Sequence, residues 1–325
     1  MMPFLIAILL SFVPALFYAA IVYWLDRFEK EPAPLLLGAF TWGAIVATIG
    51  AIIWSSVLQL GIAGLTGSAD LAEISGATLV APLVEETLKG LAVAIIFLAF
   101  PHEFDSPLDG MVYAAITALG FAATENVLYL YFAGYGQDGY AGMAALFVLR
   151  VILGGWGHAV YTAFIGIGLA VARLRRGLAS KLIAPLLGWM IAVFLHALHN
   201  AMAMLLAGSL GLAGLAATLL VDWIGWAVVF AVVVGAIFRE RRWMRIYLRE
   251  EVERGTISAE QYQTATSIRG QLRARMRGKT ARRFYETCAE LAQKQHQLAT
   301  LGEERGNTAR IAALRTQLAL LAPAV

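Results

Sequence analysis

The chain has 325 residues, of which 60% are hydrophobic and only 14% are charged, and its formal net charge is +3. Soluble domains carry about 25% charged residues, and the mean hydropathy here is +0.71. Composition therefore excludes an ordinary soluble protein and predicts an integral membrane protein. The single cysteine, Cys288, excludes an internal disulfide and a thiolate metal site.

Apolar stretches long enough to cross a bilayer follow one another along most of the chain. A membrane-spanning helix needs about 20 predominantly apolar residues. On this measure we expect seven spans, near residues 3–25, 34–62, 77–100, 109–133, 150–172, 182–207 and 213–238. The first stretch lacks a basic leader segment, so we interpret it as a retained span rather than a secretion signal. The expected fold class is an all-α, polytopic transmembrane helix bundle.

Charge divides the sequence into two parts. Residues 1–238 contain 8 Lys and Arg against 13 Asp and Glu, whereas residues 239–325 contain 17 against 9. We therefore expect a membrane core over 1–238 and a basic, soluble tail over 239–325. Apolar residues at spacings of three and four predict helices in the tail near 259–277, 280–301 and 308–321. The basic tail predicts contact with anionic lipid, and no motif in it indicates nucleic-acid binding.

The positions of the basic residues predict the orientation in the membrane. They follow the first, fifth and seventh spans, at Arg27, Lys30, Arg173, Arg175, Arg176, Lys181 and Arg239. Because Lys and Arg are enriched in cytoplasmic loops, we expect a bacterial inner-membrane protein with its N-terminus outside and its tail in the cytoplasm. The loop after the third span contains no basic residue, although this topology places it inside. The oligomeric state does not follow from the sequence.

Ionisable residues interrupt several of the apolar segments. A charge at bilayer depth costs roughly 2.5–3.5 kcal/mol, so such side chains are expected to face one another or a water-filled cavity. In the predicted topology, four of them lie roughly eight to eleven residues below the outer surface, or roughly 12–17 Å at about 1.5 Å per residue. We therefore expect them to meet in one plane. They are Glu86, Glu125, His158 and His196.

Each of these residues also has a purely structural interpretation. Glu85 and Glu86 point about 100° apart on a helix, and Glu85 can pair with Lys89. We expect Glu86 to face the site, although the reverse, with Glu85 facing it, stays open. A third possibility is that Glu85, Glu86 and Lys89 form a buried polar cluster whose role is to fix helix packing. Glu125 and His158 can equally be packing residues. Arg150 and Asp222 are expected to lie near the membrane boundaries and extend toward the interface.

The imidazole and amide groups extend the chemical possibilities. Neutral imidazole is a common zinc ligand, and His196 shares a helix face with Asn200, four residues further along. An Asn amide can donate a hydrogen bond to a developing oxyanion. His199 lies elsewhere around the same helix and is the weaker histidine candidate.

Four patterns in this order resemble the PrsW family of intramembrane proteases, which is related to the CAAX prenyl proteases. They are Glu-Glu-x-x-Lys at 85–89, Phe-x-x-x-Glu-Asn at 121–126, His158 with Gly166, and His-x-x-x-Asn at 196–200. The segment DRFEKEP at 26–32 is also typical of that family. The resemblance covers residues 15–235; His199 is an addition to the pattern, and the tail lies outside it.

The resemblance implies hydrolysis of a peptide bond in a membrane-anchored protein substrate, near the non-cytoplasmic side. In better-known relatives that substrate is an anti-sigma factor. We expect Glu86, helped by Glu85, to act as general base, and Glu125 to orient the attacking water. His158 and His196 either bind zinc, with Glu86 as the third ligand, or orient water without a metal. Asn200 is expected to stabilise the oxyanion.

Two other functions compete with this prediction. Intramembrane Glu and His residues also build proton relays and ion sites in transporters, but the sequence contains no evident inverted repeat. A non-enzymatic scaffold whose basic tail binds partners is the third interpretation.

Overall fold

The computed structural model describes residues 1–26, 30–104, 106–303 and 306–325, and all regular structure in these ranges is helical. In chain order the helices are α1 (Met2–Leu25), α2 (Ala33–Thr41), α3 (Thr48–Thr66), α4 (Ala69–Ser75), α5 (Ala81–Ala99), α6 (Pro107–Leu128), α7 (Gly136–Leu146), α8 (Gly157–Leu174), α9 (Leu178–Leu210), α10 (Leu212–Glu253), α11 (Ala259–Ala265), α12 (Ile268–Arg275), α13 (Lys279–Leu301) and α14 (Asn307–Leu321). The expected all-α fold class is confirmed.

Short segments of other helical geometry connect several of these helices. Two are 3₁₀ turns, η3 (Pro101–Glu103) and η6 (Ala322–Ala324), and four are π-helical, η1 (Trp42–Ala47), η2 (Gly76–Val80), η4 (Tyr129–Tyr135) and η5 (Phe147–Leu153). π-helical turns recur at functional sites. Here η2 directly precedes the helix that carries Glu85, and η4 directly follows the helix that carries Glu125.

Within the described ranges, five helical runs are long and apolar enough to cross a membrane: Met2–Leu25, Ala33–Thr66, Pro107–Leu174, Leu178–Leu210 and Leu212–Glu253. The chain is therefore a multi-pass membrane protein. The run from Pro107 contains both the fourth and the fifth expected spans. The third expected span corresponds to α5. This helix is not among the five runs because it contains three charged residues, Glu85, Glu86 and Lys89. The count of seven spans stays a prediction.

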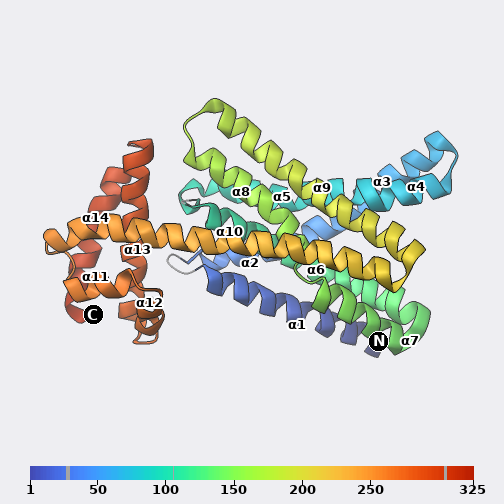
Figure 1. The fold of residues 1–325 in the computed structure, drawn as a ribbon, viewed down its shortest axis with the longest axis horizontal. Helices are drawn as coiled ribbons and strands as arrows, with labels where there is room; N and C mark the ends of the chain where they lie inside the picture. The colour runs from blue at the N-terminus through green and yellow to red at the C-terminus, as the bar shows by residue number, and fades with distance from the viewer. Residues whose placement is uncertain (27–29, 105, 304–305) are drawn as a thin grey trace.

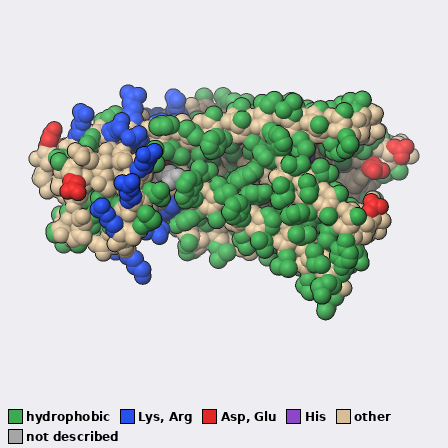
Figure 2. Space-filling view, turned by 60° about the horizontal axis from the view of Figure 1, so that its bottom comes forward, with side chains coloured by type: hydrophobic (Ala, Val, Ile, Leu, Met, Phe, Trp, Pro, Cys, Tyr) green, Lys and Arg blue, Asp and Glu red, His purple; other side chains and the backbone are tan. Residues whose placement is uncertain are grey.

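The molecular surface separates apolar from basic regions. Figure 2 shows a broad hydrophobic surface over the membrane helices, with Lys and Arg side chains gathered where this surface meets the C-terminal helices. Such a rim is typical of a cytoplasmic membrane boundary, but the orientation of the termini stays a prediction. Arg27, one of the basic residues behind that prediction, lies outside the described residues. The loop after α5 contains no basic residue of its own, but Arg173 of α8 lies beside it. The Arg173 Nε–H donates to the Pro101 carbonyl oxygen at 3.1 Å.

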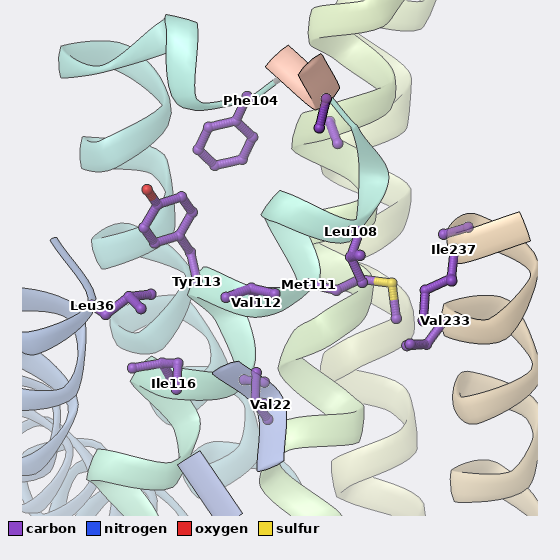
Figure 3. Close-up of a cluster of buried hydrophobic side chains, with 14 of the residues drawn as sticks. Val22, Leu36, Phe104, Leu108, Met111, Val112, Tyr113, Ile116, Val233 and Ile237 are labelled. Atoms are coloured by element: carbon purple, nitrogen blue, oxygen red, sulfur yellow. The ribbon is translucent and has the colours of Figure 1, made fainter. Parts of the chain in front are cut away.

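Helix α6 lies at the centre of the membrane part. Its residues from 108 to 123 are all buried, and its apolar side chains approach α1 at Val22, α2 at Leu36 and α10 at Val233 (Figure 3). The helix begins with a capping box. The Ser106 N–H donates to Asp109 Oδ2 at 2.6 Å, and the Leu108 N–H donates to Ser106 Oγ at 3.1 Å. This fixes the start of the helix that carries Glu125.

Glycine allows α8 to approach α6 at backbone distance. A Cβ atom added to Gly166 would lie 2.0 Å from the Gly110 carbonyl oxygen, and one added to Gly110 would lie 2.2 Å from the Gly166 oxygen. Small residues at such crossings let membrane helices pack closely. The contact explains the glycine that follows His158 in the sequence pattern, because it holds the helix carrying His158 against the helix carrying Glu125.

The C-terminal helices pack around the end of α10, at one end of the molecule (Figure 1). Leu248 of α10, Leu291 of α13 and Leu314 of α14 are buried in the shared core, so the last two helices pack together against α10. A second capping box, between Ser258 and Gln261, starts α11. Because α10 continues without a break across residue 238, the division at 238/239 stays a prediction from composition.

Candidate functional site

The two adjacent glutamates of α5 have different surroundings. Glu86 is fully buried; its Oε1 accepts from Lys89 Nζ at 2.5 Å and its Oε2 accepts from Thr162 Oγ1 at 2.8 Å. Glu85 instead lines a cavity of about 510 Å³, and its Oε2 accepts no hydrogen bond from any described residue. The structure therefore favours the reverse of the expected assignment: Glu85 faces the cavity and Glu86 lies behind it.

His196 of α9 joins the two glutamates. Its Nδ1 lies 3.0 Å from Glu86 Oε1, and its Nε2 lies 3.8 Å from Glu85 Oε2. An ionised carboxylate only accepts hydrogen bonds, so Nδ1 carries the proton and Nε2 keeps its lone pair. A carboxylate that holds one imidazole nitrogen in this way orients the other for metal binding. Glu86 thus positions His196.

A second group of charges surrounds His158 of α8. Glu125 Oε2 accepts from Arg150 Nη2 at 2.7 Å and lies 3.0 Å from His158 Nε2. On the other side of the ring, His158 Nδ1 lies 3.1 Å from Lys89 Nζ. An ammonium group has donors only, so Nδ1 is the accepting nitrogen. A metal ion bound at Nδ1 would displace the Lys89 ammonium from this lone pair.

Phe121, which begins the second sequence pattern, packs against the same group. Lys89 Nζ lies 4.4 Å from the centre of the Phe121 ring, and the ring centres of Phe121 and His158 are 5.4 Å apart. A cation over an aromatic face is stabilised by the ring quadrupole. Phe121 therefore helps to hold both the ammonium and the imidazole in place.

Three potential metal ligands come together from three helices. One donor atom from each of Glu85, His158 and His196 lies within 4.8 Å of the others. Two histidines and one carboxylate form a known catalytic zinc ligand set. The expected set contained Glu86, but both of its oxygens already accept hydrogen bonds from Lys89 and Thr162. Glu85, with an oxygen that accepts none, takes its place in the candidate triad.

The charge balance of the cluster also fits a bound cation. Glu85, Glu86 and Glu125 contribute three negative charges when ionised, whereas Lys89 and Arg150 contribute two positive charges. An uncompensated charge inside a membrane is costly. The excess is one negative charge, which favours a cation near the three donors, although a divalent ion would more than offset it.

The cavity brings together most of the residues selected from the sequence. Glu85, Glu125, His158, His196 and Asn200 line it, and Glu86 does not. Asn200 Nδ2 donates to the Ala77 carbonyl oxygen at 2.9 Å, which fixes the amide at the cavity wall. The expected meeting of these side chains is found, whereas their catalytic roles stay predictions.

Sequence reasoning misplaced two charged residues. Arg150 turns inward to Glu125 rather than extending to the interface, and Asp222, only 6% exposed, accepts from Tyr161 Oη at 3.1 Å. The prediction that these side chains extend toward the interface is wrong, because each forms an inward hydrogen bond. The sequence contained evidence for these inward contacts, because an ionisable residue inside an apolar run needs a polar partner. Nothing in the sequence marked Thr162 or Tyr161.

Fold and site together define a multi-pass helical membrane protein with a carboxylate–imidazole cluster at the wall of a cavity. A family model described as "PrsW family intramembrane metalloprotease" matches residues 31–237. This is more than half of the chain, so the protein belongs to the PrsW family, as the sequence patterns predicted.

Curated relatives carry the same family name. The chain is 32% identical to a protein from Geobacillus kaustophilus named "Protease PrsW", over 44% of this chain and 56% of the relative. It is 31% identical to a namesake from Clostridioides difficile, over 38% and 50% of the two chains, and 30% identical to one from Bacillus subtilis, over 49% and 66%. The matched part thus spans between half and two thirds of the length of these relatives. No solved structure matches the chain.

Proposed function

We propose that this chain is an intramembrane protease that hydrolyses a peptide bond of a membrane-anchored protein. The observation that carries the proposal is the meeting of Glu85, His158 and His196 donor atoms within 4.8 Å of one another, at the wall of a cavity large enough for water and a short peptide segment. Family membership supports the reaction class. The alternative of an ion-coupled transporter has no comparable support.

The same three residues would hold a zinc ion. The donor set fits, because Glu85 Oε2 is a buried oxygen without a hydrogen-bond partner among the described residues and because Glu86 leaves the Nε2 lone pair of His196 available. When bound, zinc supplies Lewis-acid polarisation and activation of water. Replacing Glu86 should weaken metal binding indirectly, since residues that orient ligands contribute about 10–100-fold to affinity.

Glu125 is the carboxylate best situated to take a proton from the attacking water. It lines the cavity, it is held by Arg150 at 2.7 Å, and in this proposal it is not itself a metal ligand. A positioned general base contributes about 10²–10⁴-fold to the rate. Asn200 has a second amide hydrogen beyond the one given to Ala77, which can donate to the oxyanion that develops on the carbonyl oxygen.

The nature of the substrate follows from where the cavity lies. Its lining residues belong to helices of the apolar part of the molecule, so the scissile bond must enter from the membrane or its surface. We infer a membrane-anchored protein substrate, and the resemblance to the PrsW family makes an anti-sigma factor the substrate class to test. The proposed orientation puts cleavage near the outer face of a bacterial inner membrane, with the basic rim against anionic lipid on the cytoplasmic side.

Metal analysis combined with a cleavage assay tests the proposal. Purified wild-type protein in lipid vesicles should contain zinc and cleave a single-span test protein, and chelation should abolish cleavage until zinc is restored. Glu85→Gln and His196→Ala should lose both metal and cleavage. Glu125→Gln should lose cleavage while retaining metal, which separates the base from the ligands.

Two results would reject this assignment. Full cleavage by both Glu85→Gln and His196→Ala would show that the triad is not the catalytic centre. An ion flux across vesicles that depends on Glu86, without any peptide cleavage, would favour the transporter.

A further inference from the structure

A second acid–imidazole pair lies at the same cavity, on residues outside the proposed metal site. Asp222 of α10 lies 2.8 Å from His199 Nδ1 through its Oδ2 and accepts from Tyr161 Oη at 3.1 Å through its Oδ1. The Asp222 side chain is only 4% exposed, whereas that of His199 is 28% exposed. His199 lines the cavity and Asp222 lies behind it.

The hydrogen bonds determine which part of His199 is available. The Asp222 carboxylate accepts a hydrogen bond from the Nδ1–H group, so Nε2, on the far side of the ring, is the nitrogen left for other partners. No described residue forms a hydrogen bond with Nε2. A buried carboxylate beneath an imidazole holds the ring in one orientation and stabilises its protonated form. This arrangement suits a group that donates a proton into the cavity.

Peptide hydrolysis needs such a donor. The nitrogen that leaves when the C–N bond breaks is a strong base and must be protonated. In the proposed function Glu85, His158 and His196 hold the metal, and Glu125 takes the proton of water. Among the histidines of the cavity, His199 has a ring nitrogen that none of these roles uses.

We propose that His199 is a further catalytic residue, which donates a proton from Nε2 to the leaving nitrogen, and that Asp222 is the residue that positions it. This inference rests on the proposed function. The water oxygen forms a bond to the carbonyl carbon and its proton passes to Glu125. The C–N bond then breaks, and the nitrogen takes the Nε2 proton. The proton on Glu125 returns to His199 through cavity water, so that one water molecule is consumed.

Tyr161 connects this pair to the metal site. Its hydroxyl donates to Asp222, and its ring stacks on His196 with the ring centres 5.2 Å apart. The alternative role for Asp222 is therefore structural, as a bond that ties α8, α9 and α10 together. A structural role predicts equal losses for every substrate, whereas a proton donor matters most for the poorest leaving group.

The test uses two single-span substrates in lipid vesicles that differ only at the scissile bond, one with the amide and one with an ester in its place. His199→Gln should lower kcat for the amide by about 10²–10⁴-fold and leave ester cleavage within a few-fold of wild type, because an alkoxide leaves with less need of a proton. Asp222→Asn should lower the ratio of amide to ester cleavage in the same direction, but less. His296→Gln, in the C-terminal helices, is the matched control and should leave both rates unchanged.

The outcomes separate the two proposals. Equal losses of amide and ester cleavage in His199→Gln, or a wild-type amide rate, would overturn the role of His199 while leaving the protease intact. If His199→Gln does not fold, the test uses the ratio of amide to ester cleavage measured with Asp222→Asn. A ratio equal to that of wild type would overturn the inference. A wild-type protein that cleaves neither substrate would reject the proposed function and this inference with it.

Discussion

Two buried carboxylates, Glu85 in the membrane core and Glu251 in the C-terminal part, show how similar burial can serve different ends. Glu251 is 0% exposed; its Oε1 accepts from Arg315 Nη2 at 2.6 Å and from Gln295 Nε2 at 3.0 Å. Its partners are side chains from α13 and α14, and together they tie these helices to α10. Glu85 is almost as buried, but it borders a cavity and faces two imidazoles.

The difference lies in what surrounds each carboxylate. Glu251 is paired with a permanent cation, and neither Arg315 nor Gln295 is a usual zinc ligand or exchanges a proton near neutral pH. Glu85 has neighbours that can do both, and space for water beside them. A buried charge therefore indicates a catalytic or metal site only when its neighbours can bind a metal or exchange a proton, and when water can reach it.

The largest expected effect separates Glu85 from Glu86. Glu85→Gln should abolish cleavage and metal binding with only a small loss of stability, because the oxygen concerned accepts no hydrogen bond in the described structure and lies 3.7 Å from Lys89 Nζ. Glu86→Gln should also lose cleavage but unfold more easily, because Lys89 and Thr162 lose a charged acceptor. Metal content and thermal unfolding of both variants in vesicles measure this. Equal stability losses in the two variants would contradict the distinction.

The contrasting site in the C-terminal part predicts a loss of stability alone. Arg315→Met leaves Glu251 buried without its cation, which should cost about 3–5 kcal/mol of unfolding free energy. Cleavage per folded molecule should stay at the wild-type level. Arg310→Met is the control, because Arg310 pairs with Glu290 at the surface and such pairs contribute about 0–1 kcal/mol. A drop in the turnover of folded Arg315→Met would mean that the tail acts on the site.

Helix packing around the site should respond to smaller changes. Gly166→Ala places a Cβ atom 2.0 Å from the Gly110 oxygen, and overpacking of this kind costs about 1–3 kcal/mol. Because α8 carries His158, cleavage should fall as well. Gly64→Ala meets no atom within 4 Å and should be neutral. Chemical unfolding of the two variants tests the pair, and similar stabilities would argue against the close α6–α8 crossing.

The smallest effect concerns Cys288 at alkaline pH. Burial raises the pKa of the Cys288 thiol above its ordinary value of 9.0, and the nearby Glu251 charge raises it further. The folded thiol therefore stays protonated where the unfolded one ionises, so the stability it contributes is complete below about pH 9 and is lost above it. The stability advantage of wild type over Cys288→Ser should shrink between about pH 8 and about pH 10. An advantage that is independent of pH, or rapid alkylation of the folded protein at neutral pH, would contradict this.

Much of this protein could be predicted from local sequence. Apolar runs determine membrane helices because every backbone group must be satisfied within a bilayer, and the cost of intramembrane charge made Glu125, His158 and His196 stand out. The start of a tail helix near residue 259 followed from the spacing of its apolar residues. These features depend on residues near one another in the chain, so periodicity and composition are sufficient.

Only the tertiary structure decided which atoms meet. The sequence could not distinguish Glu85 from Glu86, because their difference depends on Thr162 of α8 and His196 of α9, far away along the chain. For the same reason it misplaced Arg150 and Asp222, whose partners lie on other helices. A helix determines the direction in which a side chain points, but its neighbours determine whether that direction leads to a cation, a cavity or lipid.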